Sequence, residues 1–414
     1  MSNARDIFDI AQTNNNINTY KIDTSINTLK ESRWESLLKN NINKNSIDFV
    51  NRWGAMILGQ NFTPSIKSIQ TSLQSVFNND NEVIKEIEFT QLISSMVDDS
   101  EVVRITKTET DAVTSAIRVA RAYTKRDKVI KFRGCNHGIS DELLAGSTRE
   151  EVCFQSDMLG ISESAKQNTL IAEFNDVLSV VRLFSENKGD IACVIISLVA
   201  TDMGVIEVEK EFIEELTDIC LRNGALLIVD ETSTGFRLGT GGACRKFEIE
   251  ADLKIFGKII GCGFSLGAFT GNSDLMSIAE PIVQGAVCYN TMINPVAISL
   301  GIDMLSILKN NTNIYTNIDN LALYFATELR NVSPCTVHQC GSLVSLYMSD
   351  KKIKNFSDVL SCNHKMYNEL YTHLKRNNIK IPYSQYGAMY ISNSISENDI
   401  RITAELVREF FKSR

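Results

Sequence analysis

Residues 225–271 read ALLIVDETSTGFRLGTGGACRKFEIEADLKIFGKIIGCGFSLGAFTG, and this stretch decides the fold. Two short apolar runs within it, Ala225 to Val229 and Leu253 to Phe256, have the length and composition of buried strands. The first run ends on an acid, Asp230, and the second is soon followed by Lys258. The carboxyl ends of parallel strands meet at one edge of a sheet, so we expect this acid and this lysine to lie close together.

Lys258 has an unusual setting for a lysine. Gly257, Gly261 and Gly263 stand near it in the sequence, and glycines let a backbone or a ligand approach closely. Taken alone, a lysine is most often solvated, and an acid that ends a strand is most often a helix cap or an ion-pair partner. Beside each other at strand ends, they favour a pyridoxal phosphate site. There the lysine forms a Schiff base with the cofactor, and Asp230 keeps the pyridine nitrogen protonated.

The composition is that of an ordinary globular protein. The 414 residues are 43% hydrophobic and 22% charged, with a net charge of −8. We expect no nucleic-acid binding, because no excess of basic side chains is available to neutralise phosphates. No apolar run is long enough to span a bilayer, and the N-terminus lacks the apolar core of a signal peptide. The sequence therefore predicts a cytoplasmic protein that contacts no membrane.

The cysteines and histidines show no metal-binding pattern. The ten cysteines stand singly, without Cys-x-x-Cys pairs, and the four histidines do not pair with them at zinc-like spacing. Free buried thiols in a reducing cytoplasm are the simplest interpretation, and we expect no metal.

From Thr90 onward, strand-like and helix-like segments alternate, which predicts a mostly parallel sheet covered by helices. The strands expected are 47–60, 128–132, 192–198, 225–229, 253–256, 343–348 and 389–391. The helices expected are 64–77, 108–123, 212–223, 295–309, 356–377 and 397–411. We predict three parts: an N-terminal arm and segment contributing to the small domain at 1–60, a large cofactor-binding α/β domain at 61–300, and a small α+β domain at 301–414.

Two further segments are expected to reach the edge that holds Lys258. Thr108, Glu109 and Thr110 open a predicted helix, where backbone N–H groups and the helix dipole favour a phosphate, although threonine at a helix start is usually only a cap. Asn136 and His137 follow a predicted strand. In isolation His137 is better explained as a loop histidine whose hydrogen bonds are satisfied.

Several motifs, in order along the chain, resemble class III pyridoxal-phosphate aminotransferases, and most closely the glutamate-1-semialdehyde aminomutase branch. They are TDAVTSAIRVARAYTKRDKVIKFRGCNHG at 110–138, DMGVIEVEKEFIEELTDICLRNGALLIVDE at 202–231, DETSTGFRLGTGGA at 230–243, DLKIFGKIIGCGFSLGAFTG at 252–271, the NP at 294–295 and PYSQYGAMYIS at 382–392. The resemblance implies a fold-type I transferase with a mostly parallel seven-stranded sheet in the large domain and a small α+β C-terminal domain. It also implies pyridoxal 5'-phosphate as cofactor and a homodimer with shared active sites.

The resemblance also implies how the cofactor is held. Lys258 would carry the cofactor and move the substrate proton, and Asp230 would pair with the pyridine nitrogen. The other cofactor-binding positions that it implies are Thr108, Glu109, Thr110, Asn136, His137 and Thr291, the last reaching the phosphate from the neighbouring subunit.

Several positions depart from the family pattern. Glu109 replaces a glycine and places a negative charge near a dianionic phosphate, and Asn136 replaces an aromatic residue that stacks on the ring. On the substrate side, Arg52 replaces a small residue, and Trp53 matches a tryptophan near the substrate entrance. Ser197 and Gly387 each replace an acidic residue.

Three functions are compatible with these residues. We predict an aminotransferase that moves an amino group from an amino acid to a small carbonyl acceptor, such as a keto-sugar or another biosynthetic ketone, because the substrate-side positions differ from the family. The first alternative is an aminomutase of the glutamate-1-semialdehyde type. The second is a non-catalytic relative that acts as a binding subunit, an idea that Glu109 and Asn136 motivate and that Lys258 opposes.

Overall fold

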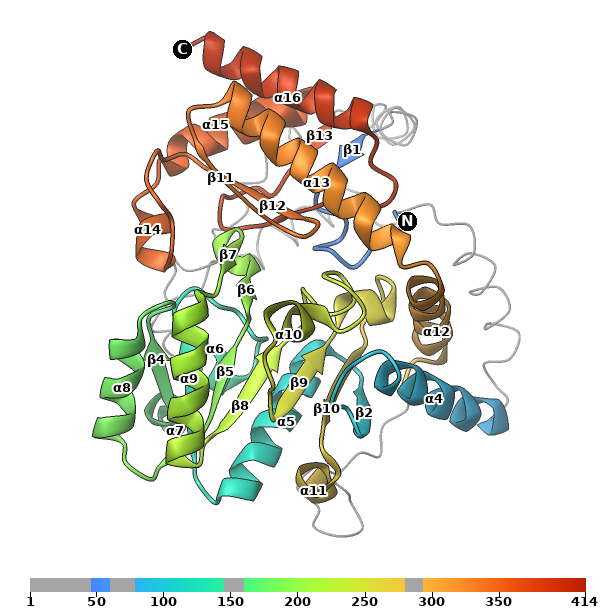
Figure 1. The fold of residues 1–414 in the computed structure, drawn as a ribbon, viewed down its shortest axis with the longest axis vertical. Coiled ribbons are helices and arrows are strands. Elements are labelled where there is room, and N and C mark those ends of the chain that lie inside the picture. The colour runs from blue at the N-terminus through green and yellow to red at the C-terminus, as the bar shows by residue number, and fades with distance from the viewer. Residues whose placement is uncertain (1–45, 60–78, 145–159, 280–292) are drawn as a thin grey trace, which may run out of the picture. The chain divides into compact units, whose positions relative to one another are not determined.

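The computed structural model describes residues 46–59, 79–144, 160–279 and 293–414 (Figure 1). The arm expected at 1–45 and the helix expected at 64–77 lie outside the described residues, as does Thr291. The chain from Ile47 to Arg414 forms one compact unit. Within the described residues, no helix is long and apolar enough to cross a membrane.

A seven-stranded sheet forms the centre of this unit, in the order β2-β10-β9-β8-β5-β3-β4 (Figure 1). Its strands in that order are Val102–Thr106, Gly267–Gly271, Leu253–Phe256, Leu226–Asp230, Ile191–Ile196, Lys128–Phe132 and Thr169–Ala172. All neighbours are parallel except β10, which is antiparallel to both β2 and β9. The expectation of a mostly parallel seven-stranded sheet is confirmed.

Helices cover both faces of the sheet because its strands are apolar on both sides. Helix α5 (Glu109–Thr124) packs on one face with Ile228, while α8 (Val177–Glu186) and α9 (Lys210–Asn223) pack on the other with Leu227 and Val229 (Figure 1). Helix α9 ends where predicted, at Gly224, whose φ of 60° is the left-handed conformation that glycine adopts most easily.

Shorter elements connect these layers. The helices are α4 (Asn79–Ser94), α6 (Asp141–Leu144), α7 (Glu163–Asn168), α10 (Gly242–Phe247) and α11 (Ser273–Met276), and the small hairpin is β6 (Val199–Ala200) with β7 (Ile206–Glu207).

The C-terminal part contains a three-stranded antiparallel sheet in the order β11-β12-β14. Its strands are Thr336–Cys340, Leu343–Tyr347 and Met389–Tyr390. Helix α13 packs against β11 and β12, and α16 packs against α13 (Figure 1). The helices of this part are α12 (Pro295–Asn310), α13 (Asn313–Val332), α14 (Phe356–Leu360), α15 (His364–Arg376) and α16 (Glu397–Lys412).

Two expectations from the sequence are wrong. The helix expected at 356–377 is two helices, α14 and α15, because the Asn363 side chain accepts the N–H of Met366 and starts a new helix there. The strand expected at 47–60 shrinks to β1 (Ile47–Asp48), which pairs with β13 (Ile379–Lys380). The limits of the three predicted parts stay a prediction.

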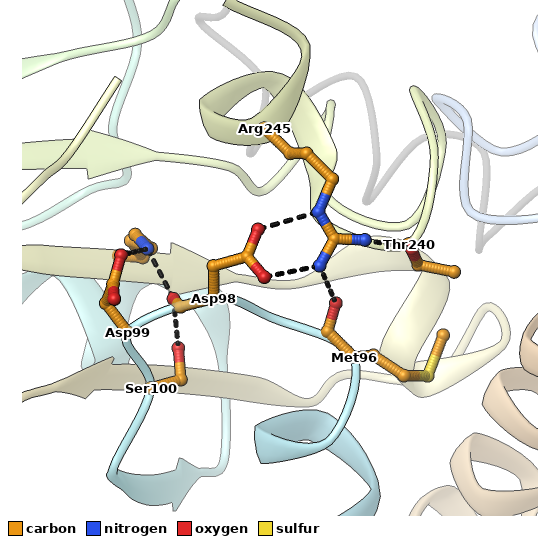
Figure 2. A network of polar contacts seen from close by, with 7 residues as sticks. Met96, Asp98, Asp99, Ser100, Thr240 and Arg245 are labelled. Carbon is orange, nitrogen blue, oxygen red and sulfur yellow. Dashed lines mark hydrogen bonds and ion pairs between the residues drawn. The ribbon is translucent and has the colours of Figure 1, made fainter. Parts of the chain in front are cut away.

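A polar network fixes the turn that leads into β2 (Figure 2). The guanidinium of Arg245, on α10, binds both carboxylate oxygens of Asp98 at 2.6 Å. The buried amine of Lys254, on β9, donates to the backbone oxygen of Asp98 at 2.6 Å. Ser94, at the end of α4, also donates to the backbone oxygen of Ser100 at 2.5 Å. The turn after α4 is therefore tied both to that helix and, through Lys254, to β9, the strand that precedes Lys258.

Arg237 is fully buried and ties three separate segments together. Its N–H groups donate to the backbone oxygens of Gly54 at 2.6 Å and Ile391 at 3.0 Å, and to the hydroxyl of Ser342 at 3.1 Å. Its guanidinium also lies 5.3 Å from the centroid of the Tyr390 ring. Burial lowers the pKa of Arg237 to about 10, so it stays charged at neutral pH.

Asp319 is a partly buried acid whose ionisation destabilises the fold. Its Oδ1 is buried without a hydrogen-bond partner among the described residues, and burial raises its pKa from 3.8 to about 6. The folded protein therefore holds this proton more tightly than the unfolded chain does. Stability falls as the pH rises from about 4 to about 7, where the folded carboxyl loses its proton.

The variant Asp319→Asn should be more stable than the wild type at pH 7 by about 1–2 kcal/mol, because it removes a charge that burial disfavours. At pH 4 the two proteins should be equally stable, since the wild-type side chain is then protonated. Urea unfolding at both pH values measures this difference. A variant that is less stable than the wild type at pH 7 would contradict the assignment.

Candidate active site

The sheet brings Asp230 and Lys258 to the same edge. Asp230 is the last residue of β8, and Lys258 follows β9 after a single glycine, Gly257. The two strands are parallel neighbours, with Asp230 opposite Ile255. The proximity expected from the strand pattern is therefore present in the structure.

Asp230 is held as an ionised acid. Its Oδ2 accepts a hydrogen bond from Nδ1 of His137 at 2.6 Å, and its Oδ1 accepts the N–H of Thr232 at 2.9 Å. Burial by itself would raise the pKa of Asp230, but the hydrogen bond and charge of His137, with the Thr232 N–H, offset it, so the pKa is lowered. Nε2 of His137 is buried and has no partner among the described residues.

Lys258 lines a cavity in a strained conformation. Its φ is 48°, in the left-handed region that lysine rarely adopts, and such strain concentrates at functional sites. Its amine donates to the Ser233 hydroxyl and lies 6.0 Å from the centroid of the Tyr390 ring. Burial favours a lower pKa, but the neighbouring acidic groups, led by Tyr390, Asp202 and Glu109, outweigh it, and the pKa of Lys258 is raised.

The cavity beside Lys258 has a volume of about 660 Å³, within the usual range for small-molecule sites. Its walls come from distant parts of the chain: the segment 52–55, the start of α5, the β6–β7 region, the loop 263–265 and the segment 382–390. Arg52, Trp53, Glu109 and Asn136, all expected at the site, line this cavity.

The other expected residues lie elsewhere. Thr108 caps α5 by accepting the N–H of Asp111 at 3.1 Å, and Thr110 packs against Gly138, where a Cβ would lie 2.6 Å from the threonine hydroxyl. His137 is buried behind the cavity wall, against Asp230. Ser197 follows β5 and does not line the cavity.

Asp202 lines the cavity although the sequence reasoning did not select it. Its Oδ2 accepts the N–H of Asn136 at 3.3 Å. Burial raises its pKa, and the charges of Lys258 and His137 oppose that rise. A signal existed in the sequence, because an acid inside the apolar run VATDMGVI at 199–206 has no obvious surface role.

Glu231 has a structural role despite its position next to Asp230. Its carboxylate accepts the N–H groups of Ala243 at 2.9 Å and Cys244 at 2.7 Å, at the start of α10, and it binds the Thr234 hydroxyl. A Cβ on Gly242 would lie 2.6 Å from its Oε2, so the glycine makes room for this cap. Of the two neighbouring acids, only Asp230 faces the site histidine.

The site fits pyridoxal phosphate in most respects. A lysine amine faces the cavity, an acid kept ionised by His137 stands at the neighbouring strand end, and a buried histidine nitrogen has no partner among the described residues. The carboxylates of Glu109 and Asp202, which line the same cavity, have the wrong charge for a phosphate. Fold and site together define a fold-type I enzyme that depends on pyridoxal phosphate.

Comparison with known proteins identifies the family. Residues 29–375 match the class-III aminotransferase family. A glutamate-1-semialdehyde 2,1-aminomutase of Alkaliphilus oremlandii is 38% identical over 365 residues, covering 88% of this chain and 86% of that protein. The chain belongs to the class-III aminotransferase family, whose enzymes use pyridoxal phosphate.

Solved structures share the fold. An omega-transaminase from Sphaerobacter thermophilus superposes with a TM-score of 0.78 at 23% identity, covering 89% of this chain and 86% of that one. A transaminase with pyridoxal phosphate bound gives a TM-score of 0.77 at 26% identity, with the same coverage of 89% and 86%.

Proposed function

We propose that this enzyme moves an amino group between carbons of a single small carboxylate substrate, as an aminomutase of the glutamate-1-semialdehyde type. The observation that carries this proposal is the 38% identity to such an aminomutase across 88% of the chain. It supports the aminomutase over the keto-sugar aminotransferase that the substrate-side residues favoured. A non-catalytic binding subunit is not proposed, because the chain belongs to an enzyme family and keeps Lys258 facing the cavity.

The residues divide the chemical work. When bound, pyridoxal phosphate supplies an electron sink that acidifies the carbon bearing the amino group. Lys258, whose amine faces the cavity, would hold the cofactor and would take the proton from the substrate carbon that bears the amino group. Asp230 holds a negative charge at the strand end, and His137 keeps its Oδ2 in place.

Arg52 is placed to bind the substrate carboxylate. It lines the cavity, and its guanidinium makes no hydrogen bond or ion pair with another described residue. Gly387, which lines the same cavity, brings no side chain: a Cβ there would lie 2.7 Å from Pro382 and 3.4 Å from the Trp53 ring. The family has an acid at the position of Gly387, and an acid there would neutralise a nearby cation. Because this chain has glycine instead, the guanidinium of Arg52 is free to bind a ligand.

The backbone that carries Arg52 is strained and tightly held. Asn51, Arg52 and Trp53 have φ values of 47°, 51° and 55°, so three successive non-glycine residues are left-handed. The Asn51 side chain donates to the backbone oxygens of Asp48 at 2.9 Å and Tyr390 at 2.8 Å. Strain that is held in this way usually serves a site, and here it aims Arg52 and Trp53 into the cavity.

The variant Arg52→Ala should raise KM for a carboxylate substrate by about 10- to 100-fold, the usual value of a hydrogen bond to a charged group, and change kcat much less. The variant Arg52→Lys should recover part of the loss, because it keeps the charge without the planar fork. Steady-state kinetics with each variant measure the effect. An unchanged KM in Arg52→Ala would remove Arg52 from the substrate site.

An intermolecular aminotransferase is the second candidate, and the replacements at Arg52, Ser197 and Gly387 favour it. Glutamate-1-semialdehyde supplied alone separates the two functions. Isomerisation without any added amino acid or carbonyl compound supports the aminomutase. Conversion that requires an added amino donor and a separate carbonyl acceptor supports the aminotransferase and overturns the aminomutase.

We also infer a cytoplasmic homodimer with shared active sites, as the family resemblance implies. Trp53 and Phe264 support a second chain at the site, because both line the cavity while 44% and 42% exposed. Light scattering of the purified protein should give twice the mass of one chain, and cell fractionation should recover it with the cytoplasmic proteins. The mass of a single chain, or recovery with membranes, would contradict this inference.

A further inference from the structure

Glu109 stands between the start of α5 and the backbone of the cofactor-binding lysine. It is the first residue of α5, after the cap Thr108, and it lines the cavity. Its Oε1 accepts the N–H of Lys258 at 2.8 Å. Its side chain passes close to the Gly257 backbone, where a Cβ would overlap its Cγ. The hydrogen bond to Lys258 therefore keeps the partly buried carboxylate at the cavity wall.

The start of α5 is otherwise suited to an anion. The first-turn N–H groups of a helix have no helical acceptor, and the helix dipole adds partial positive charge there. Asp111 N–H is already satisfied by the Thr108 hydroxyl, at 3.1 Å, which leaves the N–H groups at the very start of the helix for a ligand. In this chain the first residue of that helix, Glu109, adds a negative charge at the electropositive end.

A second acid strengthens the negative charge of this wall. Asp202 lines the same cavity, and both Asp202 and Glu109 act electrostatically on Lys258. Against these carboxylates, Lys258 and Arg52 are the cationic side chains that line the cavity within the described residues. A dianionic phosphate entering beside Glu109 meets like charge that a glycine at this position would not present.

We propose that Glu109 is a built-in competitor of the cofactor phosphate, so that this enzyme binds pyridoxal phosphate weakly and exchanges it readily. The inference rests on cofactor binding at Lys258 as stated under the proposed function. It assigns to Glu109 a role in setting the balance between the apo and cofactor-bound forms. The carboxylate accepts the Lys258 N–H, and a phosphate placed beside it would be repelled by its charge.

The test compares pyridoxal phosphate with pyridoxal, which has the same aldehyde and ring but no phosphate. The variant Glu109→Gln keeps the shape and the acceptor for the Lys258 N–H and removes the charge. The variant Glu109→Gly removes both. Asp111→Asn is the matched control, because Asp111 is an acid in the same first turn that does not line the cavity, and an asparagine can still accept from Thr108.

Apoprotein of each variant is titrated with both compounds, and binding is followed by absorption and by the rise in melting temperature. Glu109→Gln should bind pyridoxal phosphate about tenfold more tightly than the wild type, with pyridoxal affinity unchanged. Glu109→Gly should also bind the phosphate compound more tightly, and Asp111→Asn should match the wild type for both compounds.

The possible failures are distinguishable. If wild type binds both compounds and Glu109→Gln leaves the ratio of the two affinities unchanged, Glu109 is only a tie to the Lys258 backbone and the inference is overturned. The same holds if Asp111→Asn changes the ratio as much as Glu109→Gln does. If neither wild type nor any variant binds either compound, the cofactor site itself is overturned, and the proposed function fails with it.

Discussion

The variant Lys258→Ala is expected to lose amino transfer almost completely, with kcat/KM reduced by about 10⁴-fold or more, because in the proposed mechanism one side chain both binds the cofactor and carries the substrate proton. The structure motivates so large an effect: the amine faces the cavity from a strained backbone with φ of 48°, and no other lysine lines the cavity within the described residues. Turnover assays with added cofactor measure the loss.

Lys258→Arg is the informative companion variant. It keeps the positive charge near Glu109 and Asp202 but cannot act as the nucleophile or the base at neutral pH, so it should be as inactive as Lys258→Ala. Both variants should fold, since among the described residues the amine makes one hydrogen bond, to Ser233. Turnover within tenfold of wild type in either variant would remove Lys258 from the chemistry.

The variant Asp230→Asn is expected to lower kcat by about 10²- to 10³-fold while the cofactor stays bound, because the charge that keeps the ring nitrogen protonated is lost and the Lys258 attachment is not. An amide also cannot accept from His137 and Thr232 with the strength of a carboxylate, so the buried histidine is held less firmly. Rapid-mixing kinetics and the absorption of bound cofactor separate rate from occupancy.

Asp252→Asn provides the matched control for Asp230→Asn. Asp252 is a partly buried acid just before β9 that accepts the N–H of Leu227 at 2.7 Å, but it lies at the opposite end of β8 from Asp230 and outside the cavity. Its loss should cost stability and leave kcat near the wild-type value. Equal losses of kcat in the two variants would mean that Asp230 acts only through the fold.

Much of the sheet could be predicted because its strands are short apolar runs bounded by turn residues. The expected strands 128–132 and 253–256 coincide with β3 and β9. The pattern failed where tertiary contacts dominate. The segment at 47–60 is apolar enough for a strand, yet the contacts of Asn51 with Asp48 and Tyr390 hold three left-handed residues there.

The candidate site was predictable in its centre and less so at its walls. Asp230 and Lys258 end neighbouring parallel strands, so local pattern alone places them together. Asp202 and Tyr390 enter the cavity through contacts between segments far apart in the chain, which spacing cannot reveal. Glu231 is the opposite case. It stands next to Asp230 in the same motif, but it caps α10 and does not reach the site.

The expected substrate was also hard to predict from the sequence. Considered one by one, the replacements at Arg52 and Gly387 suggested a carbonyl acceptor different from the substrate of the family. In the structure both residues line one cavity, and the glycine leaves room for the Trp53 ring. Together they fit a substrate carboxylate, a group that an amino acid donor and a semialdehyde substrate both carry.

Covalent labelling of Lys258 tests the central claim most directly. Purified protein is incubated with pyridoxal phosphate and reduced with borohydride, which fixes the cofactor to whichever lysine holds it, and the label is located by peptide mass spectrometry. The account predicts that the label is confined to Lys258 and that Lys258→Ala carries none. Labelling spread over surface lysines, or no label at all, would contradict the site.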